Sequence, residues 1–205
     1  DDLHDLEPSN EEVYIQKANL LSKEDKHEEA IKFLLKAIEL SEEEADIYSL
    51  IGMEYLFLEQ FENAREYFMK CLDLDEFDYA SLYNIMYCFE YLEQVEPAIE
   101  FLNNYLNTNP YCEVAWHQLG KQYYQLKDYP KALAAYDYAI ISDDTFLGAY
   151  MEKGKVLERL GHINEALENY TITLELDDPT SYALLRVANC HEKLGNKKLA
   201  LDYYY

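Results

Sequence analysis

Basic side chains are scarce in this sequence of 205 residues, which has 17 Lys and Arg against 41 Asp and Glu and a formal net charge of −24. Such an excess of negative charge repels nucleic-acid phosphates and anionic lipid headgroups. Long apolar runs are also missing. No run approaches the roughly 20 residues of a membrane-spanning helix, and the densest is interrupted by Glu54 and Glu59. The composition argues against nucleic-acid binding and membrane insertion, and leaves a protein, a peptide or a small molecule as the ligand.

Glycine and proline are few, at 6 and 5 residues, so the composition does not indicate disorder. The cysteines form no C-x-x-C pair and show no zinc-type spacing with histidine; they are Cys71, Cys88, Cys112 and Cys190. We therefore expect buried free thiols, with no metal site and no dithiol redox centre. Free thiols favour a reducing compartment, here the cytoplasm, although packed cysteines are also compatible with a secreted protein. The 14 Lys against 3 Arg favour a bacterial source.

The chain repeats with a period of 34 residues and needs no insertion. Blocks begin at Glu11, Ala45, Tyr79, Glu113, Leu147 and Ser181. The twentieth position of every block is alanine: Ala30, Ala64, Ala98, Ala132, Ala166 and Ala200. Bulky apolar residues follow four positions later: Leu34, Phe68, Leu102, Tyr136, Tyr170 and Tyr204. This spacing places the two sets on one face of a helix in the second half of each block.

The first half of each block predicts another helix, because its fourth position is large and its eighth is small. The small residues are Ala18, Gly52, Gly120, Gly154 and Ala188, with Met86 as the exception. A small residue there and the alanine at position twenty allow two helices to approach closely. Turn and cap signals agree with this pairing: Asp128 precedes one second helix, and Gly161 and Gly195 fall between the two helices of their blocks.

One block carries a recognisable motif: Trp116, Leu119, Gly120 and Tyr123, followed by Ala132 and Tyr136. This pattern, W-x2-L-G-x2-Y and then A-x3-aromatic, resembles the tetratricopeptide repeat (TPR) signature. The resemblance implies an all-α, right-handed solenoid of tandem antiparallel helix hairpins. We expect a single solenoid over residues 1–205, with repeats at 11–44, 45–78, 79–112, 113–146 and 147–180 and a partial repeat at 181–205. Residues 1–10 resemble the tail of a preceding repeat, so we expect a slice of a longer array.

The resemblance also implies that the first helix of each repeat lines a concave ligand-binding groove. The candidate groove residues are Met53, Tyr83, Tyr87, His117, Lys121, Tyr124, Met151, Lys155 and Asn189. Our hypothesis is a bound peptide whose apolar side chains meet Tyr83 and Tyr87 and whose acidic groups meet Lys121 and Lys155. The alternative interpretation is that these lysines are ordinary solvated charges.

One TPR subtype, which captures chaperone tails, uses a lysine at position five of a repeat. That position holds Ile15, Ser49, Tyr83, His117, Met151 or Leu185 here, so the sequence argues against that subtype.

Catalytic motifs are absent from the sequence: there is no G-x-G-x-x-G, no Walker-type loop and no G-x-S-x-G elbow. The run Asp73, Asp75 and Asp78 departs from a calcium loop, whose glycine and final glutamate are missing. We expect no catalytic residue, no metal and no cofactor, and a role as a protein- or peptide-binding scaffold. Two alternatives stay open: self-association through the repeat ends, and a regulatory arm of a larger protein.

Overall fold

A computed structural model describes residues 11–41 and 44–204 of the chain, and within these ranges it contains only helices and no strand. The expected all-α helical repeat is thereby confirmed. The tail of a preceding repeat that we expected over residues 1–10 lies outside the described residues.

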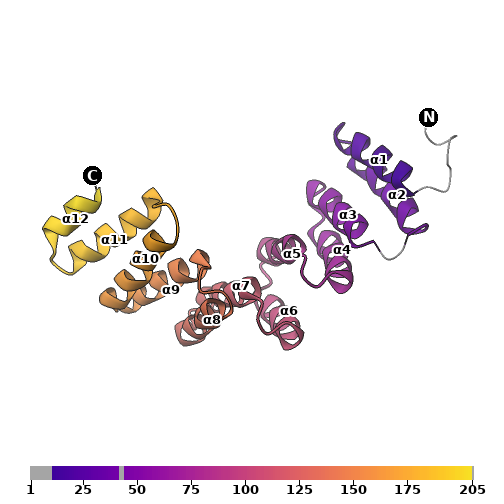
Figure 1. Cartoon of the computed structure of the whole chain (residues 1–205). Coiled ribbons are helices and arrows are strands. Elements are labelled where there is room, and N and C mark those ends of the chain that lie inside the picture. Colours follow the sequence, from indigo (N-terminus) through magenta and orange to yellow (C-terminus); the bar gives the residue numbers. More distant parts are fainter. Residues whose placement is uncertain (1–10, 42–43, 205) are drawn as a thin grey trace. The chain divides into compact units, whose positions relative to one another are not determined.

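The chain divides into two units, residues 1–94 and 95–205 (Figure 1). Unit 1 contains α1 (Glu11–Ser22), α2 (His27–Ile38), α3 (Ala45–Phe57), α4 (Phe61–Leu74) and α5 (Tyr79–Tyr91). Unit 2 contains α6 (Val95–Thr108), α7 (Glu113–Gln125), α8 (Tyr129–Ser142), α9 (Leu147–Leu160), α10 (Ile163–Leu176), α11 (Ser181–Lys193) and α12 (Lys197–Tyr204). In each unit, consecutive helices pack against one another through short connections. In unit 2, α7 and α9, which are the first helices of two successive repeats, also contact each other.

The cores of three hairpins contain the close contact that the small residues predicted. The six alanines at position twenty are all buried. A methyl group added at Gly154 would lie 2.5 Å from the ring of Tyr170, which is itself fully buried. Gly120 meets Tyr136 at the same distance, and Gly52 meets Phe68 at 2.7 Å. The glycines are therefore required by the rings that lie against them.

The sizes at positions eight and twenty-four complement each other. Where position eight is Ala18, its partner is the smaller Leu34, and both belong to one buried cluster. Where position eight is Ala188, Tyr204 is 42% exposed, and its hydroxyl bonds to Asn189 at 2.8 Å on the surface. A tyrosine is thus buried at position twenty-four where a glycine gives it room, at Gly120 and Gly154, and stays at the surface opposite Ala188.

The turn inside every hairpin has one residue in the left-handed conformation, always at position fifteen of the block. Gly161 and Gly195 occupy it with φ of +83° and +81°, as their sequence positions predicted. The other four hairpins place a residue with a side chain there: Asp25, Glu59, Glu93 and Lys127, with φ between 55° and 61°. Because this conformation is costly for residues with a Cβ, the repeat geometry overrides local preference at these four turns.

The starts of α5, α7, α8 and α11 have side-chain caps. The Asp128 carboxylate accepts a hydrogen bond from the Lys131 amide at 3.3 Å, which confirms the cap predicted before α8. Asp78 caps α5 in the same manner through the amides of Ala80 and Ser81. These caps satisfy amides that the helices leave without partners.

The four cysteines are buried and none forms a disulfide bond, as expected. Burial raises the pKa of Cys71, Cys88 and Cys190 to about 11, so these thiols stay protonated and unreactive at neutral pH. None of the described helices is both long enough and apolar enough to span a bilayer.

Candidate functional site

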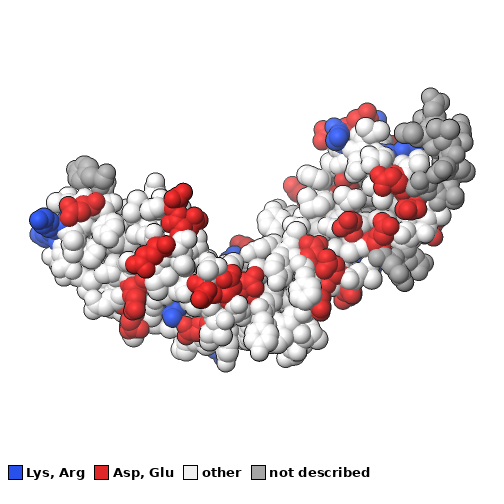
Figure 2. Space-filling model, in the orientation of Figure 1, with Lys and Arg blue, Asp and Glu red and all other residues white. Residues whose placement is uncertain are grey.

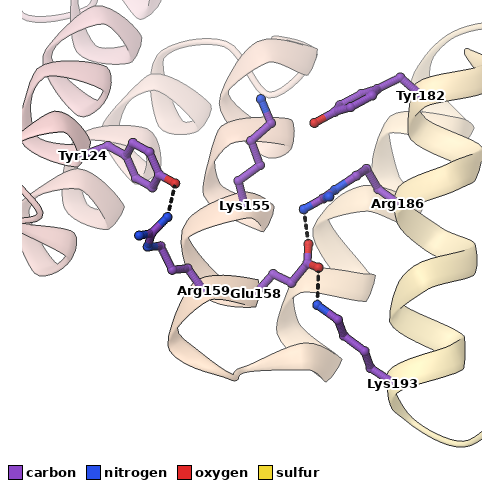
Figure 3. A pocket seen from close by; sticks show the side chains of 7 residues that line it. All are labelled: Tyr124, Lys155, Glu158, Arg159, Tyr182, Arg186 and Lys193. Atoms are coloured by element: carbon purple, nitrogen blue, oxygen red, sulfur yellow. Dashed lines mark hydrogen bonds and ion pairs between the residues drawn. The ribbon is translucent and has the colours of Figure 1, made fainter.

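A hollow of about 360 Å³ opens on the face of unit 2 formed by the first helices of successive hairpins, α7, α9 and α11 (Figure 3). We call it the cationic pocket. Its lining residues are Tyr124, Lys155, Glu158, Arg159, Tyr182, Arg186 and Lys193. Four positive side chains meet here, and they include two of the three arginines of the chain, although the chain as a whole is strongly acidic. Figure 2 shows how widely acidic side chains are spread over the visible face of both units.

Helical periodicity brings these side chains together. Lys155, Glu158 and Arg159 lie three and four positions apart on α9, so they share one face of that helix. Arg186 and Lys193 lie seven positions apart on α11, which is two turns along one face. The two faces meet across the groove between α9 and α11 (Figure 3).

The carboxylate of Glu158 lies at the centre of the pocket and organises two of the cations. Its side chain is only 9% exposed. One oxygen accepts a hydrogen bond from the Lys193 ammonium at 2.6 Å, and the other accepts from the guanidinium of Arg186. The Tyr170 hydroxyl donates a hydrogen bond, at 3.1 Å, to the Glu158 oxygen that also accepts from Arg186. Glu158 is therefore fully hydrogen-bonded, as a buried carboxylate must be.

Tyr170 connects the pocket to the core of the hairpin. Burial raises the pKa of its hydroxyl, and the hydrogen bonds from Arg186 offset part of that effect. The hydroxyl therefore remains protonated at neutral pH and can donate to Glu158. The same ring fills the space over Gly154. Close packing in the core thus fixes the position of the groups that hold Arg186.

Tyrosine rings flank the remaining cations. The Arg159 guanidinium donates to the Tyr124 hydroxyl at 3.3 Å and lies 5.9 Å from the centre of that ring. The Lys155 ammonium lies 5.5 Å from the centre of the Tyr182 ring and donates to Glu152 at 2.6 Å. Such cation–π contacts orient the charged groups without neutralising them.

The charges of the pocket do not balance. Glu158 and Glu152 supply two negative charges against the four positive charges of Lys155, Arg159, Arg186 and Lys193. The side chain of Lys193 is 50% exposed, so solvent reaches it. The arrangement can therefore bind an anionic group that enters from solvent.

Family models for the tetratricopeptide repeat match most of the chain, one at residues 11–44 and 45–78, a second at 114–146 and a third at 151–205. The chain belongs to the tetratricopeptide repeat family. Membership of this TPR family supports a role as a scaffold for protein or peptide partners. No curated protein sequence matches the chain.

Solved TPR structures have similar folds. PilF of Pseudomonas aeruginosa has 18% identity and a TM-score of 0.69, with 94% of this chain and 88% of that chain covered. YrrB, described as a TPR protein with an unusual peptide-binding site, has 23% identity and a TM-score of 0.59, with 89% and 94% covered. MamA from Desulfovibrio magneticus RS-1 has 19% identity and a TM-score of 0.61, with 81% and 94% covered. Because all three sequence identities are below 25%, these similarities establish the fold alone.

Two of the predicted groove residues, Tyr124 and Lys155, lie in the cationic pocket. Met151 and Asn189 do not line it. Met151 lines a neighbouring hollow, and the Asn189 carbonyl accepts a hydrogen bond from the Tyr204 hydroxyl at 2.8 Å.

His117 has a different environment from these residues. Its ring packs edge-on against Phe146 with the ring centres 5.3 Å apart, and its Nδ1 atom is buried without a hydrogen-bond partner. Burial lowers the pKa of His117 to about 4, and the neighbouring positive charge of Lys121 acts in the same direction. The imidazole is therefore neutral at physiological pH and contributes packing.

The predicted groove residues of unit 1 form a separate aromatic surface. Tyr83 and Tyr87 are 43% and 51% exposed, respectively. The Tyr87 ring lies 6.2 Å from that of Phe61, and Tyr91 stacks on Phe61 at 3.8 Å. Met53, on the preceding first helix, is half-buried and contacts Asn84 through its sulfur at 3.8 Å.

Three of the four cations of the pocket were missed by the sequence analysis: Arg159, Arg186 and Lys193. They lie at positions thirteen, six and thirteen of their repeats, whereas the candidate groove residues lie at positions five, nine and twelve. The stripe of positions two, six, nine and thirteen has the same helical period and is displaced by less than one turn. The scarcity of arginine could have served as the signal, because two of the three lie on first helices of adjacent repeats.

Among the residues that the structure describes, no group of three or more His, Cys, Asp or Glu side chains could hold a metal ion.

Proposed function

We propose that this TPR protein is an interaction scaffold that binds an acidic segment of a partner protein. The cationic pocket of unit 2 supplies the contact for the negative charge. The observation that carries the proposal is the convergence of four positive side chains and two tyrosines on one open hollow, in a chain whose net charge is −24. Because acidic side chains elsewhere repel an anionic ligand, a local excess of positive charge also selects where that ligand docks.

The chemistry of the pocket suits carboxylates. Arg186 presents a planar guanidinium that is already oriented by Glu158 and Tyr170, so little side-chain freedom is lost when it binds a ligand. Arg159 is exposed, and its hydrogen bond goes to an uncharged hydroxyl, that of Tyr124. An arginine has five N–H donors, so it can bind a carboxylate while it keeps this contact.

A peptide fits this surface better than a small metabolite does. The hollow is open to solvent along the face formed by α7, α9 and α11, and residues from all three helices contribute to it. An extended peptide that lies across these helices contacts several of them at once. Solenoids of stacked repeats offer extended binding surfaces of this kind.

Selection from a library of random peptides tests the proposal without a known partner. The full chain is used as bait at physiological salt, and the acidic content of the enriched peptides is compared with that of the starting library. We expect enrichment of peptides that carry Asp and Glu. A double variant, Arg159→Glu and Lys193→Glu, should lose this enrichment because the pocket then carries negative charge.

The matched control is Lys197→Glu with Lys198→Glu, which changes the net charge by the same amount on exposed positions of α12 outside the pocket. This variant should select the same peptides as the wild type, after circular dichroism has shown that both variants keep their helix content. If the wild type enriches no acidic peptides, or if the two double variants behave alike, the cationic pocket is not the docking site.

A further inference from the structure

A second hollow, of about 270 Å³, adjoins the cationic pocket within unit 2. We call it the apolar subsite. Its wall is formed by the start of α9, the end of α10 and the start of α11, with Leu147, Met151, Thr173 and Ala183 as its central residues. Lys155 and Tyr182 line both hollows, so the two are continuous.

The central wall of this subsite leaves few polar groups for a ligand to hydrogen-bond. Leu147, Met151 and Ala183 contribute apolar side chains. Two of the three hydroxyl groups in the wall already have partners in the protein, since Thr173 donates to the Tyr170 carbonyl at 2.7 Å and Thr180 accepts from the Ala183 amide at 3.1 Å. The third belongs to Tyr182, a residue that is 47% exposed. An apolar side chain can therefore enter without leaving a buried polar group unsatisfied.

Charge reverses along the groove. The rim of the apolar subsite carries Glu152, Asp177 and Asp178, whereas the cationic pocket carries Arg159, Arg186 and Lys193 beyond the shared Lys155. An acidic residue of a ligand is therefore repelled at one hollow and attracted at the other. The reversal fixes which end of a bound segment lies in which hollow.

The distance between the two hollows follows from α9, which runs along both. Met151 in the apolar subsite and Arg159 in the cationic pocket are eight residues apart on that helix. At a rise of about 1.5 Å per residue the separation is about 12 Å. An extended peptide advances about 3.3 Å per residue, so it spans this separation in three or four residues.

We propose that the groove reads a two-part motif, in which an aliphatic side chain fills the apolar subsite and a carboxylate three or four positions away occupies the cationic pocket. This inference rests on the proposed function and specifies its ligand. The occupant is an extended segment of a partner protein. The carboxylate of this segment complements the positive charge of the cationic pocket. Its aliphatic side chain carries no charge, so the acidic residues of the apolar subsite do not repel it.

Fluorescence anisotropy with designed peptides tests the motif. The probes are labelled glycine–serine peptides that carry a pair of glutamates, with no leucine, with a leucine three or four positions from the first glutamate, or with a leucine at the far end. Each leucine probe is made in both chain directions. We expect the leucine at three or four positions, in one direction, to strengthen binding to the full chain by about tenfold or more, as burial of one aliphatic side chain does. The distant leucine should add little.

Leu147→Asp is the informative variant, because it places a charge in the apolar subsite while an acidic residue at the start of α9 is favourable for the helix. It should remove the contribution of leucine and leave the binding of the leucine-free probe within about twofold. Leu201→Asp, the same substitution at an exposed position of α12, should leave both unchanged.

The outcomes separate the two proposals. If none of the glutamate probes binds, the proposed function fails together with the motif. If they bind and leucine has no effect, or acts equally at every spacing, or still acts in Leu147→Asp, then only the two-part motif is refuted.

Discussion

The contact between Gly154 and Tyr170 gives the sharpest test of how this repeat is packed. In Gly154→Ala the new methyl group would lie 2.5 Å from a ring that is fully buried and held by hydrogen bonds to Glu158 and Arg186. The ring has no free volume into which it can move, so overpacking should destabilise the hairpin by about 1–3 kcal/mol. Alanine is favoured over glycine in a helix by about 1 kcal/mol, which offsets part of this loss.

The expected net loss is up to about 2 kcal/mol, or a decrease of up to about 8 °C in the melting temperature for a chain of this size. Urea and thermal unfolding followed by circular dichroism measure it. Gly148→Ala is the matched control on the same helix, because its methyl group would lie 3.4 Å from the nearest atoms, on His117 and Phe146. That variant should be at least as stable as the wild type.

A second substitution identifies the cause of the loss. Repeat one pairs Ala18 with Leu34 at the positions of Gly154 and Tyr170, so the double variant Gly154→Ala with Tyr170→Leu copies a pair that the chain already uses. The two substitutions should therefore couple favourably in a double-mutant cycle. If Gly154→Ala is as stable as Gly148→Ala, or if the cycle shows no coupling, the close contact does not explain the glycine.

Three further predictions concern single positions in unit 2. The pKa of His117 is lowered to about 4 by burial, below the value of about 6.5 in an unfolded chain, so the unfolded state takes up the proton first and stability should fall by about 3 kcal/mol between pH 6.5 and pH 4. His117→Leu should lack this component, and parallel pH profiles of the unfolding free energy for the two proteins would contradict it. Lys127→Gly should stabilise the chain by up to about 1 kcal/mol, because glycine relieves the left-handed strain at φ 61°; a lower urea midpoint would refute this. Glu158→Ala should destabilise by about 2 kcal/mol and Tyr170→Phe by about 1 kcal/mol, since the first leaves Arg186 without its carboxylate and the second removes one hydrogen bond; equal urea midpoints would contradict that order.

The hairpin packing could be predicted because it repeats. The same small and large residues recur every 34 positions, so an alignment of the chain with itself shows which residues are in contact even though no single block does. The burial of the alanines at position twenty followed from this pattern. The four left-handed turn residues such as Glu59 and Lys127 carry no local signal, because a charged side chain does not usually indicate that conformation.

The candidate site was predicted only in part, because a binding surface does not repeat. Tyr124 and Lys155 were found from their repeat positions, whereas Arg159, Arg186 and Lys193 were missed. Position six is basic only at Arg186, and position thirteen is basic in three of the six repeats, at Lys23, Arg159 and Lys193, so the repeat pattern gives these cations little weight. Glu158 falls at position twelve of its repeat, on the predicted groove, but the sequence does not show that its carboxylate meets Arg186 and Lys193.

The sequence by itself determined the helical repeat, the hairpin contacts and the acidic character of the chain, since these depend on periodicity and composition. Only the tertiary structure decided which charges meet. Arg186 and Glu158 are 28 positions apart and come into contact because α9 and α11 both pack against α10 and line the same hollow. Electrostatic interactions depend on distances of a few ångströms between side chains, and packing between repeats fixes those distances.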